Sequence, residues 1–407
     1  MKSKFAKRAQ GLQRSTIREL LKVSQQPGII SFSGGFPDPE LFPYEELGCI
    51  AKEEITRNYA QVLTYSTTEG DYSLRQTLIE WLRKDGIVFS EEEVIITTGS
   101  QQGLDLLAKA FIDPGDVVIC GLPTYLGAIQ AFRSMSADLR GVPLDQDGMN
   151  TDVLEGLIQE LLAQGKNIRF IYTVPDFQNP STATWSRLKR HCLLNIANKY
   201  DLFVVEDMPY RQLRFMGERI PSLAEMDQQN RVIVLFTLSK VLAPGLRLGV
   251  LAGPEEVVEK ATILKQPADL CTSPLSQRLA YRFFSEQGID LYIKTLCSHY
   301  ETKCGVMVQA LEDYMPKFMG LEWTKPEGGL FIWMQLPEVI NTETMLKKAL
   351  EEKKIAYVPG SPFFVNGSGH NTLRLCFSQP TLEEIREGIK RLGQTIAETI
   401  HELERLA

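Results

Sequence analysis

The chain has 407 residues, of which 43% are hydrophobic and 23% charged, a composition typical of a folded globular protein. This length exceeds what one ordinary hydrophobic core needs, so we expect two domains. The formal net charge of −7 argues against nucleic acid as a partner, and no apolar run approaches the roughly 18 residues of a membrane-spanning helix.

The seven cysteines are scattered without a C-x-x-C pair, which is typical of reduced thiols in a cytoplasmic protein and argues against a disulfide framework. The four histidines show no H-x-x-x-H pattern, so we expect no metal site and no Ser-His-Asp hydrolase. The first 18 residues are rich in Lys and Arg and contain no acid, as in a transit peptide. The helix pattern STIRELLKV that continues from them favours a basic N-terminal arm of the mature protein instead.

Strand and helix signals alternate from about residue 90 to residue 290, which predicts a parallel sheet with crossover helices. The first predicted strand covers residues 93–99 and the helix after it residues 104–112. These strand runs are apolar almost throughout, as in strands that are covered on both faces. The further predicted strands cover residues 117–121, 168–175, 201–207, 232–239 and 245–253.

The pattern changes near residue 290, where a long helix signal runs to Tyr314 and a later amphipathic helix begins at Leu382. Shorter strand signals lie between these helices, at residues 329–336, 354–360 and 372–378. The change predicts a second, smaller α+β domain. We expect an N-terminal arm with part of the small domain at 1–48, a large domain at 49–290 and the small C-terminal domain at 291–407.

Polar residues at the carboxyl ends of the predicted strands matter most, because ligands of doubly wound sheets bind there. In TTGSQQGLDLL, Gly99 permits a tight turn, and the N–H groups of Ser100 and Gln101 would start a helix. Such a turn either binds a phosphate or simply connects strand and helix. It is not a P-loop, since the chain contains no G-x-x-x-x-G-K-[ST].

Polar residues at two further strand ends could each either bind a ligand or have only a structural role. The strand DLFVVED ends in Glu206 and Asp207, and a carboxylate there could pair with a protonated ring nitrogen, hold Mg²⁺ or face solvent. Asn179, in TVPDFQNP, could donate its amide to a ligand or serve turn chemistry.

The stretch TLSKVLAPGLRLG places Lys240 at the mouth of an apolar strand. The lysine could extend its ammonium group into water, or it could be desolvated and nucleophilic toward a carbonyl. Arg247 has the planar fork suited to phosphate, and Thr237 and Ser239 could donate hydroxyls to the same anion. An amine, an acid, an amide and a phosphate cup are together the groups that pyridoxal 5′-phosphate requires.

Ten motifs in this order resemble the fold type I PLP-dependent aminotransferases of class I/II, and within them the group of 2-aminoadipate and kynurenine aminotransferases. The resemblance implies a large PLP-binding domain with a mostly parallel seven-stranded sheet, and transfer of an amino group from an L-amino acid to a 2-oxo acid such as 2-oxoglutarate by a ping-pong mechanism. The motifs are STIRELLK, ISFSGGFPDPELFP, YSTTEGDYSLRQTL, TTGSQQGLDLL, PTYLGA, FQNP, VVEDMPYRQLRF, TLSKVLAPGLRLG, PEGGLFIWMQLP and LRLCFS.

The resemblance also implies a role for each matching residue. Lys240 would bind the cofactor's aldehyde and shuttle the substrate proton, Asp207 would keep the ring nitrogen protonated, and Tyr125 would stack on the ring. Asn179 and Tyr210 would hydrogen-bond the phenolic oxygen. The phosphate would be held by Ser100, Gln101, Thr237, Ser239 and Arg247.

Four more residues are implied to bind substrate or to link subunits. Arg374 would clamp the substrate α-carboxylate, and Gly35 would let the backbone approach it, with Asn179 alongside. Arg18, on the arm that covers the site, would meet a distal substrate carboxylate. Tyr65 would reach the phosphate of the neighbouring subunit, which implies a homodimer with shared active sites.

Two departures from the family pattern put the loop shape and the substrate preference in doubt. Thr182 replaces the glycine of N-P-T-G, and Met208 replaces the acid after Glu-Asp. The cofactor residues themselves would also serve a β-lyase or a racemase, although a clamp at Arg374 argues against decarboxylation. A non-catalytic PLP-binding sensor module is the alternative of another class, but the stretch before Ser15 is too short for its winged helix.

Overall fold

The computed structural model describes residues 4–6 and 28–406 of the chain. Its largest element is an eight-stranded sheet with the order β2-β9-β8-β7-β6-β3-β4-β5. The five strands from β8 to β4 are parallel, and β9 pairs antiparallel with β8 and β2. The expected mostly parallel sheet is confirmed, and the two-residue strand β5 adds an eighth member to the seven expected. The strands are β2 (Val94–Thr97), β3 (Val117–Leu122), β4 (Asp138–Asp145), β5 (Gly148–Met149), β6 (Ile168–Thr173), β7 (Phe203–Asp207), β8 (Val232–Thr237) and β9 (Gly249–Ala252).

Helices cover both faces of this sheet, so successive residues of one strand are buried in different hydrophobic clusters. Val204 packs in the cluster that includes the helices α5, α8 and α9, whereas Val205 packs in the cluster of α6, α7 and α11. This double burial explains why the strand sequences are apolar almost throughout. The helices are α5 (Tyr72–Lys84), α6 (Ser100–Phe111), α7 (Leu126–Ser134), α8 (Thr151–Ala163), α9 (Arg187–Lys199) and α11 (Glu255–Asp269).

Polar N-caps begin several of these helices. The Asn150 Oδ1 atom accepts the Val153 N–H at 3.0 Å ahead of α8, and the Ser186 Oγ atom accepts the Lys189 N–H at 3.2 Å ahead of α9. Each cap satisfies an N–H group that has no partner inside the helix. The helix starts are therefore fixed by local sequence.

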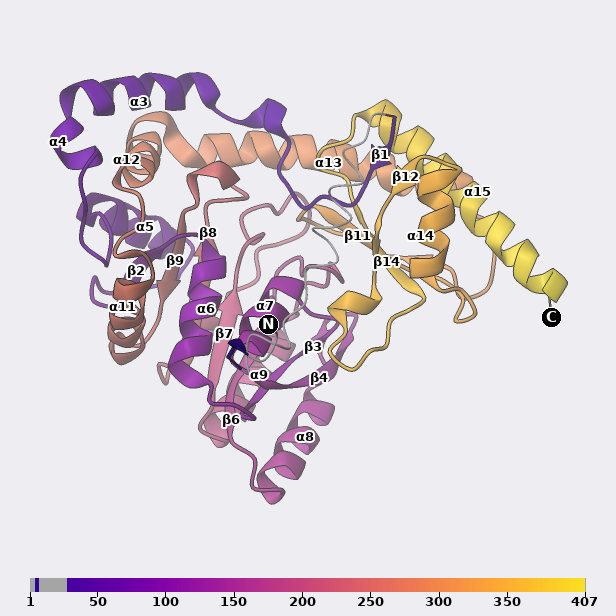
Figure 1. The fold of residues 1–407 in the computed structure, drawn as a ribbon, viewed down its shortest axis with the longest axis horizontal. Helices are drawn as coiled ribbons and strands as arrows, with labels where there is room; N and C mark the ends of the chain where they lie inside the picture. Colours follow the sequence, from indigo (N-terminus) through magenta and orange to yellow (C-terminus); the bar gives the residue numbers. More distant parts are fainter. Residues whose placement is uncertain (1–3, 7–27, 407) are drawn as a thin grey trace.

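A smaller antiparallel sheet with the order β10-β11-β14-β13 is built from the C-terminal part of the chain, next to a parallel pair of β1 and β12. The long helix α13 leads from α12 to this part, where it packs against α15 (Figure 1). The strands are β1 (Ile30–Ser31), β10 (Glu322–Trp323), β11 (Phe331–Gln335), β12 (Ile355–Ala356), β13 (Val358–Pro359) and β14 (Thr372–Cys376). The helices are α12 (Pro274–Phe283), α13 (Ile289–Tyr314), α14 (Thr342–Glu351) and α15 (Leu382–Leu406).

The N-terminal helices α3 (Tyr44–Arg57) and α4 (Tyr59–Val62) pack against α12 at one end of the molecule (Figure 1). Short segments complete the described chain, including α10 (Leu223–Met226), η2 (Pro39–Leu41), η3 (Pro244–Leu246), η4 (Phe284–Gly288) and η5 (Ser361–Phe363). Within residues 4–6 and 28–406, no helix combines the length and apolarity that crossing a membrane would require.

The parallel strands bring the predicted site residues to one edge of the large sheet. Strand β7 ends at Asp207, β8 ends shortly before Lys240, and β6 ends shortly before Asn179. Because parallel strands share the same carboxyl edge, these three side chains meet although they are far apart in sequence.

Candidate active site

A pocket opens at the carboxyl ends of β3, β6, β7 and β8, and β14 of the smaller sheet closes its other side. Every predicted site residue that the structure describes, except Tyr65, lines this pocket. These residues are Gly35, Ser100, Gln101, Tyr125, Asn179, Asp207, Tyr210, Thr237, Ser239, Lys240, Arg247 and Arg374.

Lys240 follows the end of β8 and projects into the pocket. Its Nζ atom donates a hydrogen bond to the carbonyl oxygen of Gly35 at 2.6 Å. Burial, together with the positive charges of Arg374 and Arg247, lowers the pKa of Lys240 to about 8. A substantial fraction of the amine is therefore neutral, and nucleophilic, near physiological pH.

Asp207 is almost fully buried at the end of β7, and only one of its two carboxylate oxygens has a hydrogen-bond partner among the described residues. Its Oδ2 atom accepts a hydrogen bond from the Tyr172 hydroxyl at 2.9 Å, whereas Oδ1 has no hydrogen-bond partner among the described residues. Burial raises the pKa of Asp207 to about 7, against the opposing effect of the Tyr172 hydrogen bond. A buried, unpaired acceptor of this kind is suited to a cationic N–H group of a ligand.

The turn between β2 and α6 forms one wall of an anion site. Gly99 has φ +75°, and a Cβ atom at this position would lie 2.5 Å from the Nη2 atom of Arg247. A Cβ atom at Gly249 would lie 2.5 Å from the backbone nitrogen of Ser100. Both glycines therefore allow the arginine and the first N–H groups of α6 to approach one another, and both groups attract an anion.

Hydroxyl groups complete this anion site. The Thr237 hydroxyl donates to the Ser239 Oγ atom at 2.9 Å, and Arg247 Nη1 donates to the same oxygen at 3.4 Å. The Gln101 side chain donates to the carbonyl of Gly127 at 3.1 Å at the start of α7. The guanidinium group of Arg247, hydroxyl donors and the N-terminus of α6 thus line the same pocket, as a phosphate requires.

Arg374 lies on β14 at the opposite wall and is 2% exposed. Its Nη1 atom donates to the Asn179 Oδ1 atom at 2.7 Å, its Nη2 atom donates to the Ser33 carbonyl at 3.0 Å, and its Nε atom has no partner among the described residues. The guanidinium carbon lies 4.2 Å from the ring centre of Phe331. Burial lowers the pKa of this arginine, so an anionic ligand would stabilise it.

Two tyrosines stand beside these charges. Tyr125 is the N-cap residue of α7, and a Cβ atom at Gly127 would lie 2.5 Å from its ring. Tyr210 follows β7, and its ring meets that of Phe331 edge-on at 5.6 Å. Burial raises the pKa of Tyr210 above its usual value, so the hydroxyl stays protonated as a hydrogen-bond donor.

Of the described site residues that were predicted, Tyr65 alone is absent from the pocket lining. Tyr65 is 80% exposed and does not line the pocket of its own chain. Arg18 lies outside the described residues. Conversely, Phe36, Leu126 and Gln130 line the pocket without having been predicted, although each follows a predicted residue closely in the sequence.

Both departures from the family pattern are accommodated locally. Thr182 adopts φ +62°, the left-handed conformation that a glycine would take easily, and its hydroxyl donates to Thr324 at 2.8 Å. Met208 is 1% exposed, and its N–H donates to the Leu235 carbonyl at 2.8 Å. Neither side chain is part of the pocket lining.

The sequence profile of the family described as aminotransferase class I and II matches residues 41–392. The chain belongs to this aminotransferase family. An aromatic-amino-acid aminotransferase of Thermococcus litoralis is 45% identical over 395 residues, which cover 97% of this chain and 94% of that protein. A 2-aminoadipate transaminase of Thermus thermophilus is 42% identical over 395 residues, which cover 96% of each.

The aminotransferase is also similar to a solved structure, the Pyrococcus horikoshii kynurenine aminotransferase in complex with PMP, with a TM-score of 0.93 at 42% identity and 98% coverage of both chains. The type I fold, the transamination activity and the dependence on pyridoxal 5′-phosphate follow from these relationships. The pocket fits this cofactor, because it offers an unpaired buried carboxylate oxygen, a desolvated lysine and an anion site. Among the described residues, no group of His, Cys, Asp or Glu side chains is arranged to hold a metal ion.

Proposed function

We propose that this aminotransferase uses the pocket around Lys240 to move the amino group of an L-amino acid to a 2-oxo acid, with 2-oxoglutarate as acceptor, in a ping-pong reaction. The observation that carries this proposal is the juxtaposition of a lysine of lowered pKa, a half-satisfied buried aspartate and an anion site in one pocket. When bound, pyridoxal 5′-phosphate supplies an aldehyde that captures amines and a ring that withdraws electrons from the substrate Cα.

The residues of this chain then divide the work. Lys240 would hold the cofactor in the resting enzyme, and its freed Nζ atom would take up the proton that leaves the substrate Cα. Asp207 would pair with the protonated ring nitrogen through its unpaired Oδ1 atom and so keep the ring electron-withdrawing. Asn179 and Tyr210 would hydrogen-bond the phenolic oxygen, and Tyr125 would stack on the ring.

The residues for phosphate and for carboxylate come from different walls of the pocket. The anion site of Ser100, Gln101, Thr237, Ser239 and Arg247 would hold the phosphate. Arg374 would clamp the substrate α-carboxylate, with Asn179 and the backbone of Gly35 beside it. Because a pinned carboxylate directs the Cα–H bond toward cleavage, this clamp favours transamination over loss of CO₂.

The substrate range is proposed to be broad. The similar proteins carry names for aromatic amino acids, 2-aminoadipate and kynurenine, so both dicarboxylic and aromatic donors are expected here. Arg18, on the N-terminal arm, is proposed to bind the distal carboxylate of 2-aminoadipate or glutamate, and aromatic donors would bind when the arm moves aside.

The enzyme is proposed to be a cytoplasmic homodimer with shared active sites. Tyr59, Leu63 and Tyr65 are exposed apolar or aromatic side chains next to one another in the chain, as expected of a surface that a second subunit covers. Tyr65 would reach the phosphate of the partner's cofactor. All seven cysteines are free, which suits a reducing compartment.

A panel of amino donors tests this function. Purified enzyme is given 2-oxoglutarate with 2-aminoadipate, tryptophan, tyrosine or kynurenine as amino donor, and glutamate, ammonia and CO₂ are assayed as products. We expect a new 2-oxo acid to form in step with amino transfer, and Lys240→Ala to abolish both turnover and the cofactor's visible absorbance. Release of ammonia without amino transfer would point to a β-lyase, and full transamination by Lys240→Ala would exclude the assigned role.

A further inference from the structure

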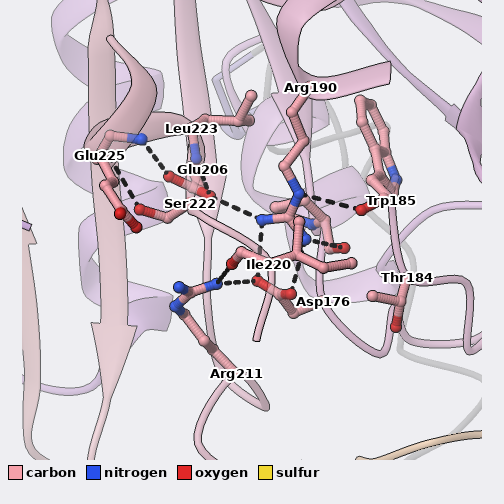
Figure 2. Close-up of polar contacts among 12 residues, drawn as sticks. Asp176, Thr184, Trp185, Arg190, Glu206, Arg211, Ile220, Ser222, Leu223 and Glu225 are labelled. Carbon is pink, nitrogen blue, oxygen red and sulfur yellow. Dashed lines mark hydrogen bonds and ion pairs between the residues drawn. The ribbon is translucent and has the colours of Figure 1, made fainter. Parts of the chain in front are cut away.

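A cluster of four buried charged side chains lies beside β7, close to the pocket but outside its lining (Figure 2). Between 0% and 5% of each side chain is exposed. Two of the four are acidic and two are arginines, so their formal charges cancel. The members of this buried ion cluster are Asp176, Arg190, Glu206 and Arg211.

Asp176 joins the two arginines of the cluster. Its Oδ1 atom lies 2.7 Å from Arg190 Nη2, and its Oδ2 atom lies 3.0 Å from Arg211 Nη1. Glu206 adds the second acid, with its Oε1 atom 3.9 Å from Arg190 Nη1. Burying such charges is costly, and a hydrophobic group of similar volume often stabilises a fold equally well. Stability alone therefore gives little reason for this arrangement.

The position of the cluster in the sequence gives a better reason. Three of its members are separated by at most three residues from a residue that is proposed to contact the cofactor ring. Side chains of successive strand residues point to opposite faces, so Glu206 enters the cluster while Asp207 faces the pocket. The pairs are Asp176 with Asn179, Glu206 with Asp207, and Arg211 with Tyr210.

The side chains of the cluster also form hydrogen bonds with the backbone of the loops that carry these ring-contacting residues. Arg190 donates to the Trp185 carbonyl at 3.1 Å (Figure 2) and to the Pro175 carbonyl at 3.1 Å. Pro175 and Trp185 bracket the loop that carries Asn179. Arg211 donates to the Ile220 carbonyl at 3.0 Å.

Glu206 and Asp85 add further hydrogen bonds and an ion pair to this network. Glu206 accepts the backbone N–H groups of Leu223 and Ala224, each at 2.9 Å. Asp85 forms a close ion pair with the Arg211 Nε atom. The loop after β6 and the loop after β7 are thus tied to one another through charged side chains rather than through apolar packing alone.

We propose that the buried ion cluster is a positioning device, which holds the two loops so that Asn179, Asp207 and Tyr210 keep their places around the cofactor ring. This inference rests on the proposed function, in which those three residues contact the ring. A residue held loosely by even about 1 Å would weaken hydrogen bonds to the ring and slow the reaction up to about 100-fold. The cluster therefore acts through the ring contacts and does not touch substrate.

The test uses Asp176→Asn, which leaves the two arginines of the cluster underneutralised, and a matched control elsewhere in the same sheet. Asp116 has 7% of its side chain exposed and lies 2.6 Å from Arg169 Nε, at the amino ends of β3 and β6 away from the pocket. Asp116→Asn removes a single, less buried ion pair, because 34% of the Arg169 side chain is exposed. Both variants are compared with the wild-type holoenzyme for melting temperature, for the pH dependence of the cofactor's visible absorbance, and for the dissociation constant of pyridoxal 5′-phosphate.

We expect both substitutions to lower the melting temperature, but only Asp176→Asn to shift the absorbance midpoint, by about one pH unit, and to raise the dissociation constant about tenfold. In steady-state assays, Asp176→Asn should lower kcat more than it raises KM for the amino donor. If Asp176→Asn does not fold, the double variant Asp176→Asn/Arg211→Gln, which removes one charge of each sign, takes its place.

A folded variant of the cluster whose absorbance midpoint and cofactor affinity equal those of Asp116→Asn would overturn the proposal and leave the cluster a merely structural feature. A failure of the proposed function would give a different result: the wild type would lack the visible absorbance, or Lys240→Ala would retain it.

Discussion

At the scale of single residues, burial acts in opposite directions on the two groups that define the pocket. It lowers the pKa of Lys240 to about 8 and raises the pKa of Asp207 to about 7. Both shifts favour the uncharged form of the side chain, because each residue is buried at the end of an apolar strand and has few polar partners. A cofactor with a protonated ring nitrogen for Asp207 and an aldehyde for Lys240 would relieve the free-energy cost of burying these two groups.

The lowered pKa of Lys240 predicts how the cofactor-free enzyme captures pyridoxal 5′-phosphate as the pH changes. Only the neutral amine is nucleophilic, so below the pKa the capture rate should rise roughly tenfold per pH unit. Above about pH 8 the rate should level off. Stopped-flow absorbance measures the profile, and a simple alkylamine in solution, whose rate keeps rising beyond pH 10, is the control. A profile for the enzyme that matches the control would show that Lys240 is not desolvated.

At the scale of elements, the turn between β2 and α6 shapes the phosphate site. Gly99→Ala would place a Cβ atom 2.5 Å from Arg247 Nη2 and force an alanine to φ +75°. We expect the dissociation constant of the cofactor to rise at least about tenfold, because the arginine must leave the anion site.

Gly115→Ala is the matched control for this substitution. Gly115 has φ +91°, but a Cβ atom there meets nothing within 4 Å. Both variants should lose about 1 kcal/mol of stability to backbone strain, with cofactor affinity unchanged in Gly115→Ala. Equal cofactor affinities in the two variants would contradict the role given to the turn.

The strands of the large sheet and the polar residues that follow them could be predicted, because an apolar run followed by polar residues is a signal within a short stretch of sequence. The sequence did not predict β4, since the strand Asp138–Asp145, which lies next to the two-residue edge strand β5, has one buried residue and no apolar run. The contacts of Arg190 with Asp176 and Glu206 were also missed, because ion pairs across a fold leave no spacing in the sequence. The assigned roles of the pocket residues stay predictions, and so do the domain boundaries.

At the scale of the whole molecule, Tyr65 is exposed, as the proposed dimer with shared active sites expects of a residue that reaches the partner subunit. In a shared-site dimer, mixing Lys240→Ala subunits with Tyr65→Ala subunits creates hybrids with one intact site. That site combines Lys240 from one chain with Tyr65 from the other.

Random reassociation would make half of the dimers hybrids, each with one working site of two, so about a quarter of the wild-type activity should return. Activity after joint refolding is compared with that of each variant refolded alone. If activity did not rise above these separate values, Tyr65 would have to act within its own chain or not at all.

The most direct test of the whole account asks which side chain holds the cofactor. Borohydride reduction of the loaded enzyme fixes the cofactor to its lysine, and peptide mass mapping then locates the added phosphopyridoxyl group. The account predicts that the group lies on the peptide containing Lys240. Label on another lysine, such as the buried Lys265 beside Asp269, would contradict it.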